Sequence, residues 1–161
     1  MGSIKQMYIY TDGSCLRNKK GGWAFIVVEQ GHVTWEQSGH KHHTTNQEME
    51  LEAMHQALLY ASVPAILYSD SQYVVKGLNT WCKDWATRGF TSTGRGAPLH
   101  HAALWQAMYP LSAPHVIQWV KAHNGHVFNE HVDRLAVQAA RGAGADAAAR
   151  APTSIPKESG L

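Results

Sequence analysis

The sequence has few cysteines, no long apolar run and little net charge. Its two cysteines, Cys15 and Cys82, are too few for a disulfide-stabilised scaffold, and we expect two free thiols in a reducing compartment. No stretch reaches the roughly 18 consecutive apolar residues of a membrane-spanning helix. A charged-then-apolar secretory leader is also missing before the first strand-like segment. These absences predict a cytoplasmic protein that does not associate with membranes.

What is present suits one globular domain. The chain has 161 residues, of which 44% are hydrophobic, and a chain of that length buries roughly 70% of its surface on folding. Disorder as the main state is therefore excluded. Residues 76–121 carry five basic residues against one acidic residue, interleaved with aromatic side chains. That mixture is typical of a surface that binds a polyanion, whose bases or sugars would pack on the aromatic side chains. A solvated helix and loop with no binding role would have the same composition.

Hydrophobic periodicity predicts an α/β fold with a five-stranded mixed sheet flanked by helices. Strands are expected at 7–12, 22–28, 33–38, 65–68 and 116–120, and helices at 45–62, 71–79, 80–87, 99–111 and 129–141. We expect Thr45 and Glu48 to cap their helix, two helices to meet near Gly77, and Pro110 to end another. The first three strands should form an antiparallel meander, and the other two should run parallel to the first. Residues 1–141 should form one domain, and the Ala-, Gly- and Pro-rich residues 142–161 a flexible tail.

Two aspartates follow matching strands of this predicted sheet. Asp12 ends the first strand and Asp70 ends the fourth, each in a similar tetrapeptide. Ligands of open α/β sheets bind just beyond the carboxyl ends of the strands, so neighbouring strands would bring the two carboxylates together. Aspartate also closes strands as an ordinary turn residue, which is the alternative for each.

Two further acids lie on the apolar faces of predicted helices. Glu50 has Ala53, Met54, Ala57 and Leu58 at helical spacing, so it should face the sheet. The same pattern places Asp133 on the stripe that includes residues 136, 137 and 140. A carboxylate near a core is costly unless it is paired or binds a metal, and a local salt bridge or an edge position is the alternative.

Convergence of all four acids would favour a divalent cation. Close carboxylates repel one another, and Mg²⁺ removes that conflict because it prefers oxygen ligands. Two such ions suit phosphodiester hydrolysis. The histidines at 123, 126 and 131 lack cysteine partners and a zinc-protease motif, which argues against zinc. His123, on a loop after a strand, suits proton transfer near the carboxylates, whereas a solvated loop histidine is the plain alternative.

The ordered set of motifs resembles bacterial type 1 ribonuclease H, the ribonuclease HI family, which cuts the RNA strand of RNA–DNA hybrids. The matching pieces are TDGSC at 11–15, TTN at 44–46, MEL at 49–51, SDSQYV at 69–74, Trp81 and Trp85 with RGF at 88–90, VKAHNGH at 120–126, NE at 129–130, and Asp133. They span about residues 5–141 in order and with compatible spacing.

The resemblance implies a role for each matching residue. It implies that the metal-binding catalytic acids are Asp12, Glu50, Asp70 and Asp133, and that His123 moves protons or helps product release. The residues that it implies for contacts with the hybrid are Asn18, Thr45, Asn46, Gln47, Gln72, Trp81 and Trp85. The segment around Trp85 lacks the family's lysine-rich run, so we expect weaker but salt-sensitive binding.

The hypothesis from the sequence is an endonuclease specific for the RNA of RNA–DNA hybrids. Two Mg²⁺ ions, for which Mn²⁺ can substitute, would serve the four acids, and the products would carry 3′-hydroxyl and 5′-phosphate ends. We expect a monomer, with a single-strand DNA-binding protein as a candidate partner. The alternatives are a module that binds hybrids without cutting them, and a resolvase- or integrase-like nuclease of the same broad fold.

Overall fold

The computed structural model describes residues 6–62, 64–91, 99–122, 124–142 and 148–150. A single mixed sheet forms its centre, with strand order β5-β4-β1-β2-β3-β6. The strands are β1 (Met7–Cys15), β2 (Gly21–Glu29), β3 (His32–Lys41), β4 (Ala65–Ser69), β5 (Val116–Trp119) and β6 (Ala148–Arg150). The antiparallel meander of β1–β3 and the parallel pairing of β4 with β1 and of β5 with β4 are confirmed.

Two strands differ from the prediction. β1 continues past Asp12 to Cys15, because β2 pairs with it as far as the Cys15–Gly21 position. A sixth strand, β6, pairs antiparallel with β3 inside the segment that we expected to be a flexible tail. Its three residues show no hydrophobic alternation, so nothing in the local sequence predicted it. The other residues of the predicted tail, apart from Gly142, lie outside the described part of the chain.

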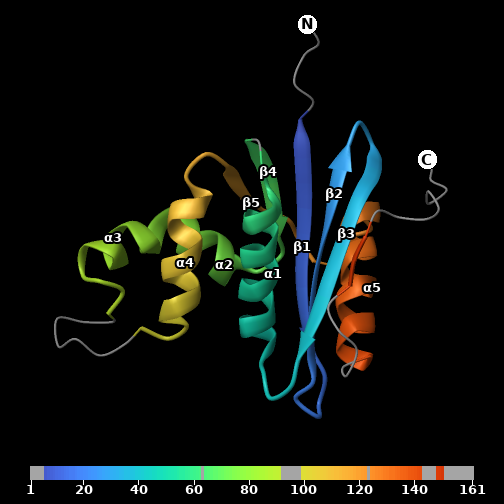
Figure 1. The fold of residues 1–161 in the computed structure, drawn as a ribbon, viewed down its shortest axis with the longest axis horizontal. Coiled ribbons are helices and arrows are strands. Elements are labelled where there is room, and N and C mark those ends of the chain that lie inside the picture. The colour runs from blue at the N-terminus through green and yellow to red at the C-terminus, as the bar shows by residue number, and fades with distance from the viewer. Residues whose placement is uncertain (1–5, 63, 92–98, 123, 143–147, 151–161) are drawn as a thin grey trace, which may run out of the picture.

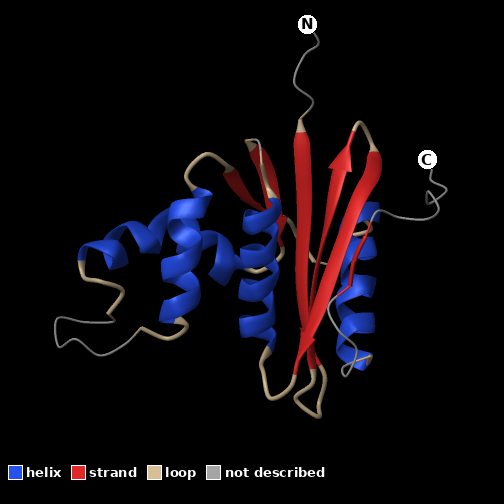
Figure 2. Cartoon of the chain, viewed as in Figure 1, coloured by secondary structure: helices blue, strands red, loops and turns tan. Residues whose placement is uncertain are grey.

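The helices cover the sheet on both faces (Figure 1, Figure 2). They are α1 (Asn46–Tyr60), α2 (Gln72–Lys76), the π-helical turn η1 (Gly77–Trp81), α3 (Cys82–Thr87), α4 (Ala102–Ser112) and α5 (Val127–Arg141). The larger core joins α1, α4 and the α2–α3 region to one face, and the smaller core joins α5 to the other. All but the last residue of β2 is buried, as its place between two helical layers requires.

The helix boundaries bear out one prediction and correct another. Helices α2 and α3 meet through η1, which begins at Gly77. A Cβ at position 77 would stand 2.0 Å from the ring of Trp105, so that ring packs directly on the glycine backbone. Pro110 does not end α4, which continues to Ser112. It lies in the last turn, where it removes one backbone hydrogen bond of the helix, while the buried side chains of Trp105 and Met108 hold α4 against the core.

Candidate active site

The pairing of β1 with β4 brings the two aspartates together. Parallel pairing aligns Tyr10 with Tyr68, so Asp12 and Asp70 stand two residues further on at equivalent positions. The Thr11 hydroxyl donates to the Tyr68 carbonyl at 2.8 Å and ties the strand ends to each other. The expectation that these strands are neighbours is therefore confirmed.

Glu50 joins the aspartates because α1 packs very closely on β1 at Gly13. A Cβ at position 13 would stand 2.3 Å from the backbone nitrogen of Glu50, so only glycine permits this approach. The Gly13 amide donates to Asp12 Oδ1 at 2.9 Å and to Glu50 Oε1 at 3.1 Å. Gly13 was noted in the sequence only as part of a motif, and its contact with the helix emerges from the packing.

The three acids form a group whose geometry suits a metal ion. One carboxylate oxygen from each of Asp12, Glu50 and Asp70 lies within 4.8 Å of the others. Asp12 is buried, while Glu50 and Asp70 are half-buried. Asp133, on α5, hydrogen-bonds to Asp12 from the opposite face of the sheet but lies outside this compact set. The four predicted acids thus meet at one end of the sheet.

The electrostatics of the group show the cost of placing these acids together. Burial, the charge of Asp70 and the hydrogen bond with Asp133 raise the pKa of Asp12 to about 9. Burial and the charges of Asp12 and Asp70 hold the pKa of Glu50 well above its usual range. A bound cation would stabilise the ionised carboxylates, and three oxygen donors are the ligands that Mg²⁺ prefers. The residues therefore fit a divalent metal site.

The candidate histidines have different outcomes. His123 lies outside the described residues. His131 instead pairs with the buried Glu36 of β3, at 2.8 Å between Nε2 and Oε2. In the part of the chain that the structure describes, the only group of three or more potential metal ligands is that of Asp12, Glu50 and Asp70.

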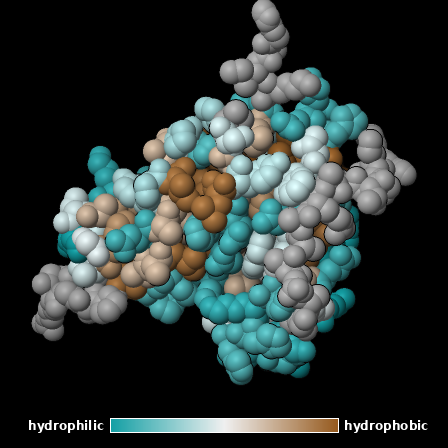
Figure 3. All heavy atoms as spheres, viewed as in Figure 1, coloured by the Kyte–Doolittle hydropathy of each residue, from teal (hydrophilic) through white to brown (hydrophobic). Residues whose placement is uncertain are grey.

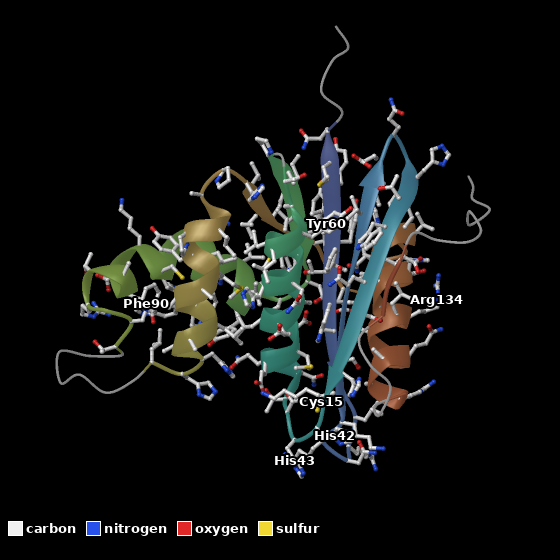
Figure 4. The ribbon with its side chains drawn as sticks, in the orientation of Figure 1. Cys15, His42, His43, Tyr60, Phe90 and Arg134 are labelled. Carbon is white, nitrogen blue, oxygen red and sulfur yellow. The ribbon has the colours of Figure 1, made fainter. Side chains whose placement is uncertain are left out.

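The predicted substrate contacts at the lower end of the molecule surround the loop after β1. Asn18 and the first residues of α1 are exposed there, next to Cys15, His42 and His43 (Figure 4). The Cys15 amide donates to Asn46 Oδ1 at 2.7 Å, which joins the end of β1 to the start of α1. This end of the molecule is strongly hydrophilic (Figure 3).

The same residues also build the local structure. Asn18 Oδ1 accepts from the Lys20 amide at 3.0 Å and shapes the loop. Thr45 caps α1 by accepting from the Glu48 amide, as the capping pattern predicted, but the Glu48 carboxylate turns to Lys41 and Thr44.

The remaining predicted contacts lie around α1 and the α2–α3 helices. Gln47 on α1 and Gln72 at the start of α2 are exposed. Trp81 and Trp85 are half-buried in one aromatic cluster, with ring centroids 5.7 Å apart. Trp85 packs in turn on the fully buried Trp105 at 5.3 Å. The core thus orients the two rings while part of each remains accessible.

Comparison with known proteins matches most of the chain to a single protein family. A family model described as RNase H matches residues 4–141. The ribonuclease H of Cupriavidus metallidurans is 41% identical over 138 residues, which cover 83% of this chain and 94% of that protein. The ribonuclease H of Herminiimonas arsenicoxydans is also 41% identical, with 83% of this chain and 93% of that protein covered.

Solved structures agree on the fold. The crystal structure of LC9-RNase H1, a type 1 RNase H with the type 2 active-site motif, has a TM-score of 0.75 and 27% identity. The match covers 96% of this chain and 78% of that one. The solution structure of the PFV RNase H domain has a TM-score of 0.72 at 23% identity, covers 86% of this chain and 96% of that one, and supports the fold alone.

Across the described residues, every helix is too short or too polar to span a lipid bilayer.

Proposed function

The chain belongs to the ribonuclease H family, and from that premise we propose that it is an endonuclease that hydrolyses the RNA strand of RNA–DNA hybrids. The observation that carries this proposal is the convergence of Asp12, Glu50 and Asp70, with oxygen atoms within 4.8 Å of one another. Part of a foamy viral protease-reverse transcriptase has the same fold, and the structure of that protein in complex with an RNA/DNA hybrid supports the substrate class. Catalysis would then depend on the metal ions that these carboxylates bind.

We propose that Asp12, Glu50, Asp70 and Asp133 hold two Mg²⁺ ions, for which Mn²⁺ can substitute. When bound, the ions would supply an activated water and stabilise the leaving oxygen. Cleavage would then give products with 3′-hydroxyl and 5′-phosphate ends. The Gly13 amide orients Asp12 and Glu50 by donating to both carboxylates. His123 serves as the group that moves a proton near the site.

Selectivity for hybrids would come from the residues around the site. The exposed polar side chains of Asn18, Asn46 and Gln72, with Thr45 and Gln47, would contact the 2′-hydroxyls of the RNA strand and the phosphates. The half-buried Trp81 and Trp85 would pack on the DNA strand. Duplex DNA lacks the 2′-hydroxyls, and duplex RNA lacks the deoxyribose surface. The catalytic domain that does this would comprise residues 1–141.

The decisive experiment compares cleavage of hybrid, duplex RNA and duplex DNA, first with Mg²⁺ and then with a chelator. We expect cutting of the hybrid alone and complete loss of cutting after chelation. Equal cutting of duplex DNA, or cutting that survives chelation, would contradict the proposal. Hybrid binding without turnover at any Mg²⁺ or Mn²⁺ concentration would indicate a binding module, and cutting of branched DNA would indicate a different nuclease.

A single substitution ties the activity to the acids. Asp70→Asn keeps the shape of the side chain and removes its charge, so we expect loss of cleavage with an unchanged circular dichroism spectrum. If the Asp70→Asn enzyme were active without metal, the assignment of Asp70 to the active site would be contradicted. Cytoplasmic location, a monomeric state and a single-strand DNA-binding partner stay predictions.

A further inference from the structure

Asp70 differs from the other acids of the site in its backbone. Asp12 lies inside β1, Glu50 inside α1 and Asp133 inside α5. Asp70 lies between the end of β4 and the start of α2, outside every regular element. Helix and sheet hydrogen bonds therefore hold three of the acids, whereas another device must hold the backbone at Asp70.

The end of β5 supplies that device. The last ladder pair of the two strands is Ser69–Trp119, and Asp70 stands one residue beyond it. The indole Nε1–H of Trp119 donates to the backbone carbonyl of Asp70 at 3.1 Å. The next residue, Val120, donates its amide to the Ser69 carbonyl at 3.0 Å. The carbonyls of Ser69 and Asp70 are thus both held by consecutive residues of one strand end.

The position of the indole favours this role over a packing role. Trp119 is 44% exposed, so its large ring contributes less to the core than a buried tryptophan would. A hydrogen bond to the carbonyl restricts rotation about the Cα–C bond of Asp70, and that restriction limits where the Asp70 carboxylate points. The carboxylate must point toward Asp12 and Glu50 for the three oxygen atoms to converge as observed.

We infer that Trp119 is a positioning residue, whose indole N–H holds the Asp70 backbone so that the Asp70 carboxylate is pre-aligned for a divalent cation. The inference rests on the proposed function and deepens it, because it names a residue outside the acids that sets metal affinity. Hydrogen-bonded partners of metal ligands commonly change metal affinity about 10-fold or more when removed.

The test is Trp119→Phe, which keeps an aromatic ring and removes the N–H. The matched control is Trp35→Phe, because Trp35 Nε1 donates to Gln37 Oε1 at 3.2 Å on β3 and Trp35 stacks on Tyr60, in the larger core on the α1 face. Each variant loses one indole hydrogen bond, and Trp35 is the more buried of the two residues. Any general effect of a smaller ring should therefore be at least as large in the control.

Calorimetric titration of Mn²⁺ and Mg²⁺ into the substrate-free proteins gives the primary readout. We expect the metal dissociation constant of Trp119→Phe to rise about 10-fold and that of Trp35→Phe to stay at the wild-type value. The KM for hybrid should be unchanged, and kcat should recover at saturating Mg²⁺. Equal metal affinities in the two variants, or a raised KM with unchanged metal affinity, would overturn the inference.

A second measurement does not depend on the stability of the variant. In wild-type protein labelled with 5-fluorotryptophan, six fluorine resonances are expected, and Mg²⁺ should shift that of Trp119 but not that of Trp35. An unmoved Trp119 resonance in an enzyme that binds Mg²⁺ and cuts hybrids would overturn the inference and leave the proposed function standing. A wild-type protein that neither binds metal nor cuts would instead overturn the proposed function.

Discussion

At the scale of single residues, the site is built from charges that folding alone does not favour. Asp12 is 3% exposed and lies beside Asp70 and Asp133, which together with burial raise its pKa to about 9. Folding therefore traps a proton on Asp12 at neutral pH when no cation is present. Such groups, with strongly shifted pKa values beside specific charged partners, are typical of functional sites.

Asp12→Asn should stabilise the metal-free protein at high pH. Between about pH 4 and 9 the folded state retains on Asp12 a proton that the unfolded state has lost, so wild-type stability falls as pH rises. The asparagine does not titrate, so the variant's stability does not fall in this way as pH rises. Its side-chain oxygen can still accept the hydrogen bond from the Gly13 amide. We expect it to be more stable by about 1–3 kcal/mol at pH 8 in chelator, with little difference near pH 4.

Urea unfolding at pH 4.5 and pH 8 checks this prediction, where the pH values are about the ends of the expected window. Asp84→Asn is the control, because Asp84 is an exposed acid that pairs with Arg88 on the surface and contributes about 0–1 kcal/mol. A destabilised Asp12→Asn protein at pH 8 would contradict the argument. Activity should be lost at both pH values.

At the scale of elements, two close approaches of helices to strands bring the acids into range. α1 meets β1 at Gly13, and α5 meets β2 at Gly22, where a Cβ would stand 2.3 Å from the Ala136 carbonyl oxygen. α1 carries Glu50 and α5 carries Asp133. The distance of each helix from the sheet therefore sets the position of one acid.

Gly22→Ala should displace α5 and move Asp133 away from Asp12. Overpacking of this kind costs about 1–3 kcal/mol, and we expect kcat to fall more than hybrid affinity. Thermal unfolding and single-turnover kinetics measure the two effects. Gly142→Ala is the control at the end of the same helix, since its Cβ would lie 3.3 Å from the Gln138 carbonyl oxygen. Wild-type kinetics in Gly22→Ala would show that the α5 position does not matter.

Thr45→Ala should loosen the start of α1. The hydroxyl accepts from the Glu48 amide, and loss of such a cap costs about 1 kcal/mol. Thr45→Ser keeps the hydroxyl and should retain wild-type stability in urea unfolding. If both variants bind hybrid weakly but only Thr45→Ala is less stable, the methyl group contributes to binding. Equal stability of Thr45→Ala and wild type would contradict the capping role.

At the scale of the whole molecule, one sheet separates two cores and gathers the site at its end. The larger core anchors α1 and the aromatic cluster of the α2–α4 region, and the smaller one anchors α5. The acids lie around the carboxyl end of β4 and the neighbouring part of β1, on the side of the exposed loops and helix starts expected to contact the hybrid. Residues 6–142 contain all of these parts that the structure describes.

Truncation after Gly142 should leave the nuclease activity intact. The shortened chain keeps the hydrogen bond that the Gly142 amide donates to the Gln138 carbonyl, and it loses only β6 from the described elements. Since β6 pairs with β3 at three residues, we expect a small loss of thermal stability and an unchanged kcat. Loss of cleavage by a folded truncated protein would place the C-terminal segment in the catalytic unit and contradict the proposed domain boundary.

Local patterns in the sequence indicated which faces of the helices and strands are buried and which acids lie on them. Period-2 and helical patterns located the first five strands and the main helices, and they placed Glu50 and Asp133 on inward faces. They also marked Asp12 and Asp70 as equivalent positions on parallel strands. These inferences succeed because periodicity is a local property that burial imposes on each element separately.

How those elements meet depends on contacts between segments that are distant in the sequence. The extension of β1 depends on β2, the packing of Trp105 on η1 depends on Gly77, and the fit of α1 on β1 depends on Gly13. The indole of Trp119 reaches Asp70 from 49 residues away in the sequence. Local patterns report that a surface is buried but not which atoms cover it, so contacts between distant segments emerge only when the chain is folded.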